Sequence, residues 1–427
     1  MSPDELKTQV ELLLSAVVEA ANSKGMELER LRGVALYNGQ KDQFITSIPQ
    51  FAAVESGVKE LERMPKMYGV AQSHRIALQF VYEYFDRANG VVCNSAALDT
   101  LWEDFITELD TPVWITRSVT NLRYFQCKEH PVDLGDGVSI LDRNPAVLAS
   151  LGFEPGIVER LNADWSGFGA SSFVLVAEVT DPKRPENFLT TNGSGVWLKT
   201  ARAIGAMRLI AGGDIGGSVA FHQLVARFNF GIGGISSTGP TVQTMGSSYT
   251  WASAQGAAYD STYAALARLE KIGYGKAPGN LDLALRSFMA TYDRYPTAID
   301  TKLVDSITAL EAILGTDSEI SFKLSYRVAS LLASDDDQRA ILLRTVKDFY
   351  NVRSRIVHGG HLSPKQNKSL AAVDELRDLV RRLLYSFVQF AANDKPTLSK
   401  GYFAEELDAA LIHAQSRENL RKLLRLV

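Results

Sequence analysis

One amphipathic stretch near the C-terminus constrains the fold of this chain more than any other feature. It runs from about Asp335 and reads LLRTVKDFYNVRSRIVHGG up to a double glycine, Gly359 and Gly360. Positions spaced four, three, four and three residues apart form one register within it: Leu342, Val346, Phe349, Arg353 and Ile356. Such spacing returns to one face of an α-helix, and glycine adopts the left-handed conformation at a helix C-terminus at little cost. The stretch therefore predicts a helix that ends at the double glycine.

Two polar residues of this helix are candidates for function. Arg353 lies in the apolar register, where a guanidinium is costly unless it is paired or lines a cleft. His358 follows in the last turn, where the negative end of the helix dipole favours the protonated imidazole. Five residues of an ideal helix turn through roughly 500°, so the two side chains would point about 140° apart. They can converge only if the helix ends or distorts near His358, or if a second molecule supplies the matching pair.

Three blocks in this order surround the pair: DSITALEAILG at 305–315, FKLSYRVASLL at 322–332 and YNVRSRIVHGG at 350–360. Together they resemble the Apea-like branch of the HEPN superfamily. The resemblance implies a C-terminal helical bundle and, as in many HEPN proteins, a metal-independent endoribonuclease with an Arg-x4–6-His motif. It assigns the catalytic roles to Arg353 and His358, and it implies a homodimer in which both motifs line one cleft. Proteins of this kind often serve in anti-phage defence or as toxins.

The chemistry of RNA cleavage fits these two residue types. The 2′-hydroxyl next to each phosphate is an internal nucleophile. A histidine transfers its proton, while an arginine binds the phosphate oxygens and stabilises the transition state. No metal is required, and the expected products carry 2′,3′-cyclic phosphate and 5′-hydroxyl ends.

Structural roles compete with these catalytic ones. Arg353 would form an ion pair across the bundle, with Glu311 or Asp348, and His358 would cap the helix end. Arg355 and His361 form an overlapping alternative pair, ranked lower because the family's histidine directly precedes a glycine.

Three further residues are expected to support the motif. Ser354 stands where the family often has Asn or Asp, which weakens the expected orientation of the histidine or the phosphate. Glu311 and Arg327 are charged residues on mostly apolar helices. We expect them to form a buried pair between two helices, with support of the motif as the alternative.

The composition narrows the class of protein. The 427 residues carry a net charge of -4, which argues against a protein that coats nucleic acid through a broad basic face. The sequence shows neither a signal peptide nor a run long enough to span a membrane, so we expect a cytoplasmic protein. It shows no metal-ligand spacing, and we expect no cofactor. Cys93 and Cys127 are expected to be buried rather than bridged.

The chain divides into four predicted regions: 1–110, mainly helical; 111–275, mixed α/β and of unknown role; 278–395, the HEPN-like bundle; and 396–427, an amphipathic helix. We therefore predict a multidomain, mainly α fold with a mixed middle region. In that region 113–119 and 171–179 are typical of strands, and 195–211 is typical of a helix. The glycines at 231–234 favour a turn over a nucleotide site, because they do not match G-x-G-x-x-G.

The bundle is predicted to contain helices at 281–293, 298–314, 319–333, from Ser334 to the double glycine, and from Ser363 onwards. Ser334 and Asp337 have capping-box spacing, and Pro364 follows an N-cap serine. The last helix is expected to cover 402–426. Two functions remain: an RNA endonuclease, and a non-catalytic RNA- or protein-binding module with sensing by residues 1–275.

Overall fold

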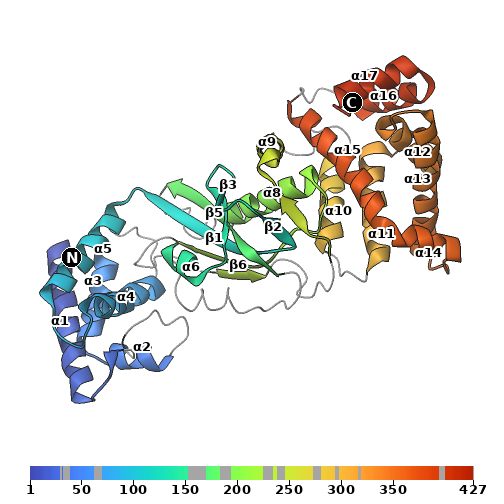
Figure 1. Cartoon of the computed structure of the whole chain (residues 1–427). Coiled ribbons are helices and arrows are strands. Elements are labelled where there is room, and N and C mark those ends of the chain that lie inside the picture. The colour runs from blue at the N-terminus through green and yellow to red at the C-terminus, as the bar shows by residue number, and fades with distance from the viewer. Residues whose placement is uncertain are drawn as a thin grey trace.

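The computed structural model describes residues 1–28, 31, 39–61, 70–151, 170–182, 194–224, 234–237, 246–272, 280–293, 298–315, 319–393 and 400–426. Figure 1 shows helices at the N-terminal end, a β-sheet in the middle and a helical bundle at the C-terminal end. The predicted mainly α, multidomain fold with a mixed middle region is confirmed. Among the described helices, none is both long and apolar enough to cross a membrane.

In its described residues the N-terminal region contains five α-helices: α1 (Pro3–Ser23), α2 (Gly39–Thr46), α3 (Gln50–Glu60), α4 (Val70–Ala88) and α5 (Ser95–Asp110). Ser2 caps α1 in a capping box with Glu5, and the apolar stripe of α1 is buried. Phe80 packs edge-on against Phe105 with ring centroids 4.8 Å apart. These helices enclose a hydrophobic core of their own, which runs from Leu6 to Leu109.

The middle region is organised around an antiparallel sheet with strand order β3-β4-β5-β1-β6-β7. Its strands are β1 (Val113–Arg123), β3 (Val132–Asp133), β4 (Val138–Asp142), β5 (Ala170–Pro182), β6 (Gly216–Leu224) and β7 (Gly234–Ser237). A turn at 135–137 joins β3 to β4, and all three of its residues have positive φ. Two short strands, β2 (Phe125–Cys127) and β8 (Tyr249–Trp251), pair in parallel beside this sheet.

The two faces of the sheet are covered by different helices. Successive side chains of a strand point to opposite faces. Leu175 of β5 joins the core that includes Met207 of α8 (Ser194–Ile210). Its neighbours Val174 and Val176 pack with Leu148 of α6 (Pro145–Ser150). Helix α8, which was predicted at 195–211, therefore covers one face of the sheet. The hydrophobic core on that face continues into the bundle.

The C-terminal bundle follows a single 3-10 turn, η3 (Ser253–Gln255), and contains nine helices in the described residues. They are α9 (Gly256–Ile272), α10 (Leu281–Asp293), α11 (Ile299–Leu314), α12 (Ile320–Leu332), α13 (Asp336–Val357), α14 (Pro364–Ala371), α15 (Val373–Asn393), α16 (Lys400–Ile412) and α17 (Ala414–Leu423). One buried apolar cluster extends from Leu122 to Leu424. The sheet, α8 and the bundle therefore share a core.

Helix boundaries in the bundle follow local signals. Ser363 and Gln366 form the capping box of α14, with Pro364 in its first turn, as predicted. Gly315 ends α11, and a Cβ at that position would lie only 2.2 Å from the carbonyl oxygen of Glu311. Glycine is therefore required there by the close approach of the backbone.

Three expectations about the chain are wrong in detail. Helix α13 is capped by Asp335, whose side chain accepts from Gln338 N–H at 2.7 Å, instead of by Ser334. The last helix is broken at His413, which separates α16 from α17. Both cysteines are free, but Cys93 is exposed and Cys127 is only half-buried. Most of the glycine-rich stretch 231–234 lies outside the described residues.

Candidate active site

The predicted register of α13 is buried within the bundle. Val346 and Phe349 are fully enclosed, and Leu342 and Ile356 are partly buried against the shared core. Arg353 lies on the same side of the helix with its side chain 25% exposed. Helices α11 and α12 of the same chain cover this side of α13. The apolar stripe is therefore satisfied without a second chain.

Arg353 forms an ion pair with α11. Its Nη2 lies 3.4 Å from Oε2 of Glu311, a pair that links residues 42 positions apart. The guanidinium Nε is buried, and it has no hydrogen-bond partner among the described residues. A buried donor without a partner carries a desolvation cost. At 3.4 Å the ion pair with Glu311 is long, and it uses only part of the hydrogen-bonding capacity of Arg353.

Tyr350 lies beside the same carboxylate and was missed by the sequence analysis. Burial, together with the negative charge of Glu311, raises the pKa of the Tyr350 phenol. Tyr350 precedes Arg353 by three residues, so the two side chains share one face of α13. That spacing is the signal in the sequence that could have identified Tyr350.

The end of α13 forms the predicted glycine stop. Gly359 has φ of 67°; its N–H donates to Ile356 O at 3.0 Å, and Gly360 N–H donates to Arg355 O at 2.9 Å. This is the Schellman pattern of hydrogen bonds, which satisfies the last carbonyls of a helix. The C-cap residue is His358, as the structural alternative predicted, and its backbone N–H bonds Ser354 O at 3.1 Å.

The two motif side chains face different surroundings. Arg353 is directed at Glu311 on α11, whereas His358 is exposed at the helix end. No ion pair of His358 is found among the described residues. The helix continues to Val357 without distortion that would turn the two side chains towards each other. Within one chain, the structure does not bring Arg353 and His358 into a shared contact.

The other candidates lie near the same helix end. Ser354 is half-buried one residue after Arg353, and Arg355 and His361 are exposed. A Cβ on Gly360 would lie 3.0 Å from Cδ of Arg355, so this arginine packs along the glycine turn. Asp348, the second partner considered for Arg353, pairs with Lys365 of α14 at 3.1 Å.

The expected pair between Glu311 and Arg327 is wrong. Arg327 is 1% exposed, and it donates from Nη1 to Leu314 O at 2.7 Å. Its Nε donates to Asp408 Oδ1 on α16 at 3.1 Å. The guanidinium therefore joins α12 to the end of α11 and to α16, which leaves Glu311 free to pair with Arg353. Arg327 holds the bundle together and lies outside the motif.

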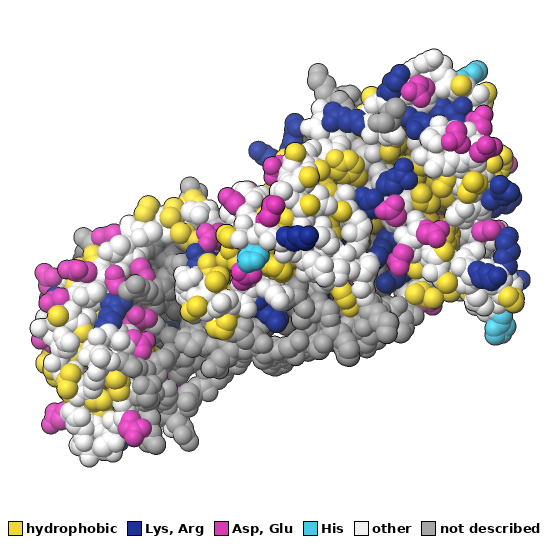
Figure 2. All heavy atoms as spheres, viewed as in Figure 1, with side chains coloured by type: hydrophobic (Ala, Val, Ile, Leu, Met, Phe, Trp, Pro, Cys, Tyr) yellow, Lys and Arg dark blue, Asp and Glu magenta, His cyan; other side chains and the backbone are white. Residues whose placement is uncertain are grey.

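Charge is distributed unevenly over the face of the molecule that Figure 2 shows. In Figure 2, Lys and Arg gather over the C-terminal bundle, and Asp and Glu gather over the N-terminal helices. The described residues contain no group of three or more His, Cys, Asp or Glu side chains that could hold a metal ion. Comparison of the chain with protein-family models, curated proteins and solved structures gave no match.

Proposed function

We propose that this protein is a metal-independent endoribonuclease of the HEPN type, with a site centred on Arg353 and His358. The observation that carries the proposal is the state of Arg353. A guanidinium that is 25% exposed and whose ion pair is as long as 3.4 Å retains capacity for an oxyanion at its exposed part. Phosphate oxygens bind arginine in this way. The exposed His358 at the end of the same helix supplies a group suited to proton transfer.

The position of the site agrees with an anionic substrate. In the view of Figure 2 the cationic side chains concentrate on the bundle that carries the motif. Arg355 lies in the last turn of α13 and is exposed. Local cations of this kind attract a phosphate backbone even where the net charge of the chain is negative.

The proposed site is completed by a second chain. The apolar stripe of α13 gives no support to a dimer, because α11 and α12 of the same chain bury that stripe. The dimer proposal instead depends on the divergence of Arg353 and His358 along one helix, roughly 140° for five residues. A two-fold interface presents each motif twice, so the arginine of one chain can meet the histidine of the other. Val357, 51% exposed in the last turn of α13, is an apolar residue suited to that interface.

The test uses labelled RNA with purified protein in EDTA. We expect cleavage by the wild type, none by Arg353→Ala or His358→Ala, and products with 2′,3′-cyclic phosphate ends. His361→Ala is the matched control, because it removes an equally exposed histidine three residues away. Full cleavage by folded Arg353→Ala and His358→Ala proteins would exclude this site.

The same assay can test whether the site is formed by two chains. A mixture of Arg353→Ala and His358→Ala chains should recover part of the activity that each mutant lacks alone, if each cleft draws on both chains. A monomer that cleaves RNA at the full rate would contradict the shared cleft.

A binding or sensing protein is the second candidate. The ion pair between Arg353 and Glu311 favours it, since the pair gives the arginine a structural purpose. RNA that binds without being cut, with equal affinity for wild type and His358→Ala, would support this alternative.

A further inference from the structure

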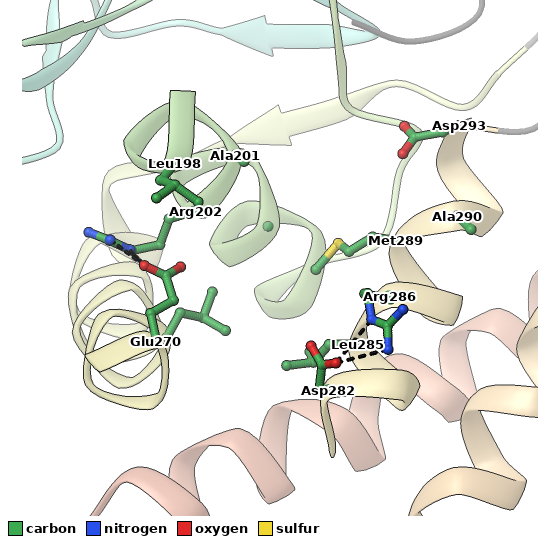
Figure 3. A pocket seen from close by; sticks show the side chains of 12 residues that line it. Leu198, Ala201, Arg202, Glu270, Asp282, Leu285, Arg286, Met289, Ala290 and Asp293 are labelled. Atoms are coloured by element: carbon green, nitrogen blue, oxygen red, sulfur yellow. Dashed lines mark hydrogen bonds and ion pairs between the residues drawn. The ribbon is translucent and has the colours of Figure 1, made fainter. Parts of the chain in front are cut away.

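A pocket of about 510 Å³ lies where the middle region meets the bundle. Figure 3 shows that its walls come from α8, which covers the sheet, and from α9 and α10. A volume of this size is typical of small-molecule sites. The pocket is separate from the proposed nuclease motif, none of whose residues lines it.

The interior of the pocket is largely apolar. Leu198 of α8, Leu266 of α9, and Leu285 and Met289 of α10 contribute its hydrocarbon surface. Gly205 of α8 adds no side chain, and a Cβ there would lie 3.3 Å from Cε of Met289. Figure 3 shows the Met289 side chain extending from α10 towards α8. The interior therefore suits an apolar ligand body.

Two of the charged groups in the lining are already neutralised by partners in the pocket wall. Arg202 donates from Nε to Glu270 Oε2 at 3.1 Å, and its Nη1 lies 3.3 Å from the Tyr263 hydroxyl. Arg286 binds Asp282 one helical turn earlier, at 2.9 Å. Both pairs are drawn as dashed lines in Figure 3.

Asp293 is also ion-paired, but its partner does not line the pocket. It lies at the far end of the α10 face from Asp282 (Figure 3), with its side chain 52% exposed. Its partner Arg208 is only 7% exposed, is not part of the lining, and reaches Oδ1 at 3.0 Å. The lining itself thus has one more carboxylate than guanidinium. Arg208 balances this third carboxylate from outside the lining, and Asp293 remains half exposed in the pocket wall.

We propose that this pocket binds a small organic cation, with its ammonium group at Asp293 and its apolar body over Met289 and Leu285. The ammonium would add a charge-assisted hydrogen bond to an accessible carboxylate. The hydrocarbon part would remove apolar surface from water. An anion of the same shape would meet the excess carboxylate, and a neutral molecule would gain only the apolar contact.

Three probes of equal chain length test the proposal on the full protein: hexylammonium, 1-hexanol and hexanoate. A ligand that binds only the folded state raises the midpoint of thermal unfolding. We expect hexylammonium to raise the midpoint and to give a saturable calorimetric titration, with little response to the other two probes. An equal response to all three, or no response to hexylammonium, would overturn the proposal.

Two variants locate the ammonium group. Asp293→Asn should weaken hexylammonium binding about tenfold, because a hydrogen bond to a charged group is lost. The amide oxygen of that variant can still accept from Arg208, so the fold should be retained. Asp282→Asn is the matched control, since the partner of Asp282, Arg286, is itself in the pocket wall and would repel a cation there, and its effect should be less than about threefold. Equal losses in both variants would contradict the assignment of Asp293.

A third variant tests the pocket without changing charge. Ala290 is part of the lining on α10, and Ala290→Phe would occupy the apolar volume. We expect this variant to abolish the hexylammonium titration and to leave the RNA assay unchanged. Retained binding in a folded Ala290→Phe protein would show that the cation binds elsewhere.

Discussion

At the scale of single residues, Arg353 has two roles, one in the stability of the bundle and one in the proposed cleavage of RNA. Its ion pair with Glu311 stabilises the contact between α11 and α13, and in our proposal the exposed part of its guanidinium binds the phosphate. His358 has no such double role, because its side chain is exposed at the helix end. The two residues should therefore differ in their effect on stability, although our proposal requires both for cleavage.

We expect Arg353→Ala to lower the free energy of unfolding by about 1 kcal/mol, the upper range for a partly exposed ion pair. His358→Ala should change it by less than about 0.5 kcal/mol, as exposed substitutions do. Both should abolish RNA cleavage. Urea unfolding beside the cleavage assay measures the two effects, and a His358→Ala protein that loses as much stability as Arg353→Ala would assign His358 a structural role.

Arg327 of α12 is a fully buried charged side chain that binds the end of α11 and α16. We expect Arg327→Ala to lower the free energy of unfolding by about 3 kcal/mol, because it removes a fully buried side chain and its bonds to Leu314 and Asp408. Lys365→Ala, at an exposed pair with Asp348, should change stability by less than about 0.5 kcal/mol. Equal effects in urea unfolding would contradict the difference in burial.

At the scale of elements, helix ends were predictable because their signals are local. The double glycine after His358 and the Ser363–Pro364 start of α14 are visible within a few residues of sequence. Partners of the charged residues were not predictable in the same way. Arg327 binds Asp408, 81 residues away, and Arg353 binds Glu311, 42 residues away. Such pairs depend on which helices pack together, and periodicity does not define that packing.

The stop of α13 can be tested at Gly359. Its φ of 67° disfavours any residue with a Cβ, so Gly359→Ala should lower the free energy of unfolding by about 1 kcal/mol. Gly256→Ala is the matched control: Gly256 has helical φ of −52°, and its Cβ would meet nothing within 4 Å. That control should stabilise the protein by about 0.5 kcal/mol. Thermal unfolding with the same sign for both variants would contradict this account.

At the scale of the whole molecule, an ionic cluster joins the middle region to the bundle. The ring of Tyr292 on α10 lies between two guanidiniums, with Arg208 Cζ at 4.4 Å and Arg377 Cζ at 4.6 Å from its centroid. Arg377 also pairs with Asp214 at 2.7 Å. The cluster was missed by the sequence analysis because its residues come from α8, the segment after it, α10 and α15.

The cluster predicts a dependence of stability on pH. Burial alone raises the pKa of the Asp214 carboxyl, but the Arg377 ion pair and hydrogen bonds from Ser247 outweigh burial and hold the pKa below its usual value. A depressed carboxyl pKa stabilises the fold above the unfolded pKa of about 3.9, and this stabilisation is lost as the pH falls through the folded-state pKa. The difference in unfolding free energy between wild type and Asp214→Asn should therefore be largest near pH 7 and should shrink below about pH 4. A difference that is constant from pH 7 to pH 3 would exclude Asp214 as the cause.

The separate N-terminal core predicts that the chain unfolds in two steps. Phe80 belongs to the core of α1–α5, whereas Phe387 belongs to the core that the sheet shares with the bundle. In calorimetry, Phe80→Ala should lower the midpoint of one transition and Phe387→Ala the midpoint of the other. Large-to-small changes at buried phenylalanines cost about 3–5 kcal/mol, enough to separate the two. A single transition moved equally by both variants would show that the two cores unfold together.

The shared core also limits how the C-terminal bundle can be used in isolation. Met207 and Leu209 of α8 are packed in the same cluster as Leu383 and Leu384 of α15. A fragment beginning at α10 would expose the apolar side chains that α8 and α9 now cover, and exposed surface of that kind promotes aggregation. The bundle is therefore not a portable module. Fusions, truncations and natural domain exchanges should retain the whole chain from β1 onwards, whereas α1–α5 can be removed or replaced as a unit.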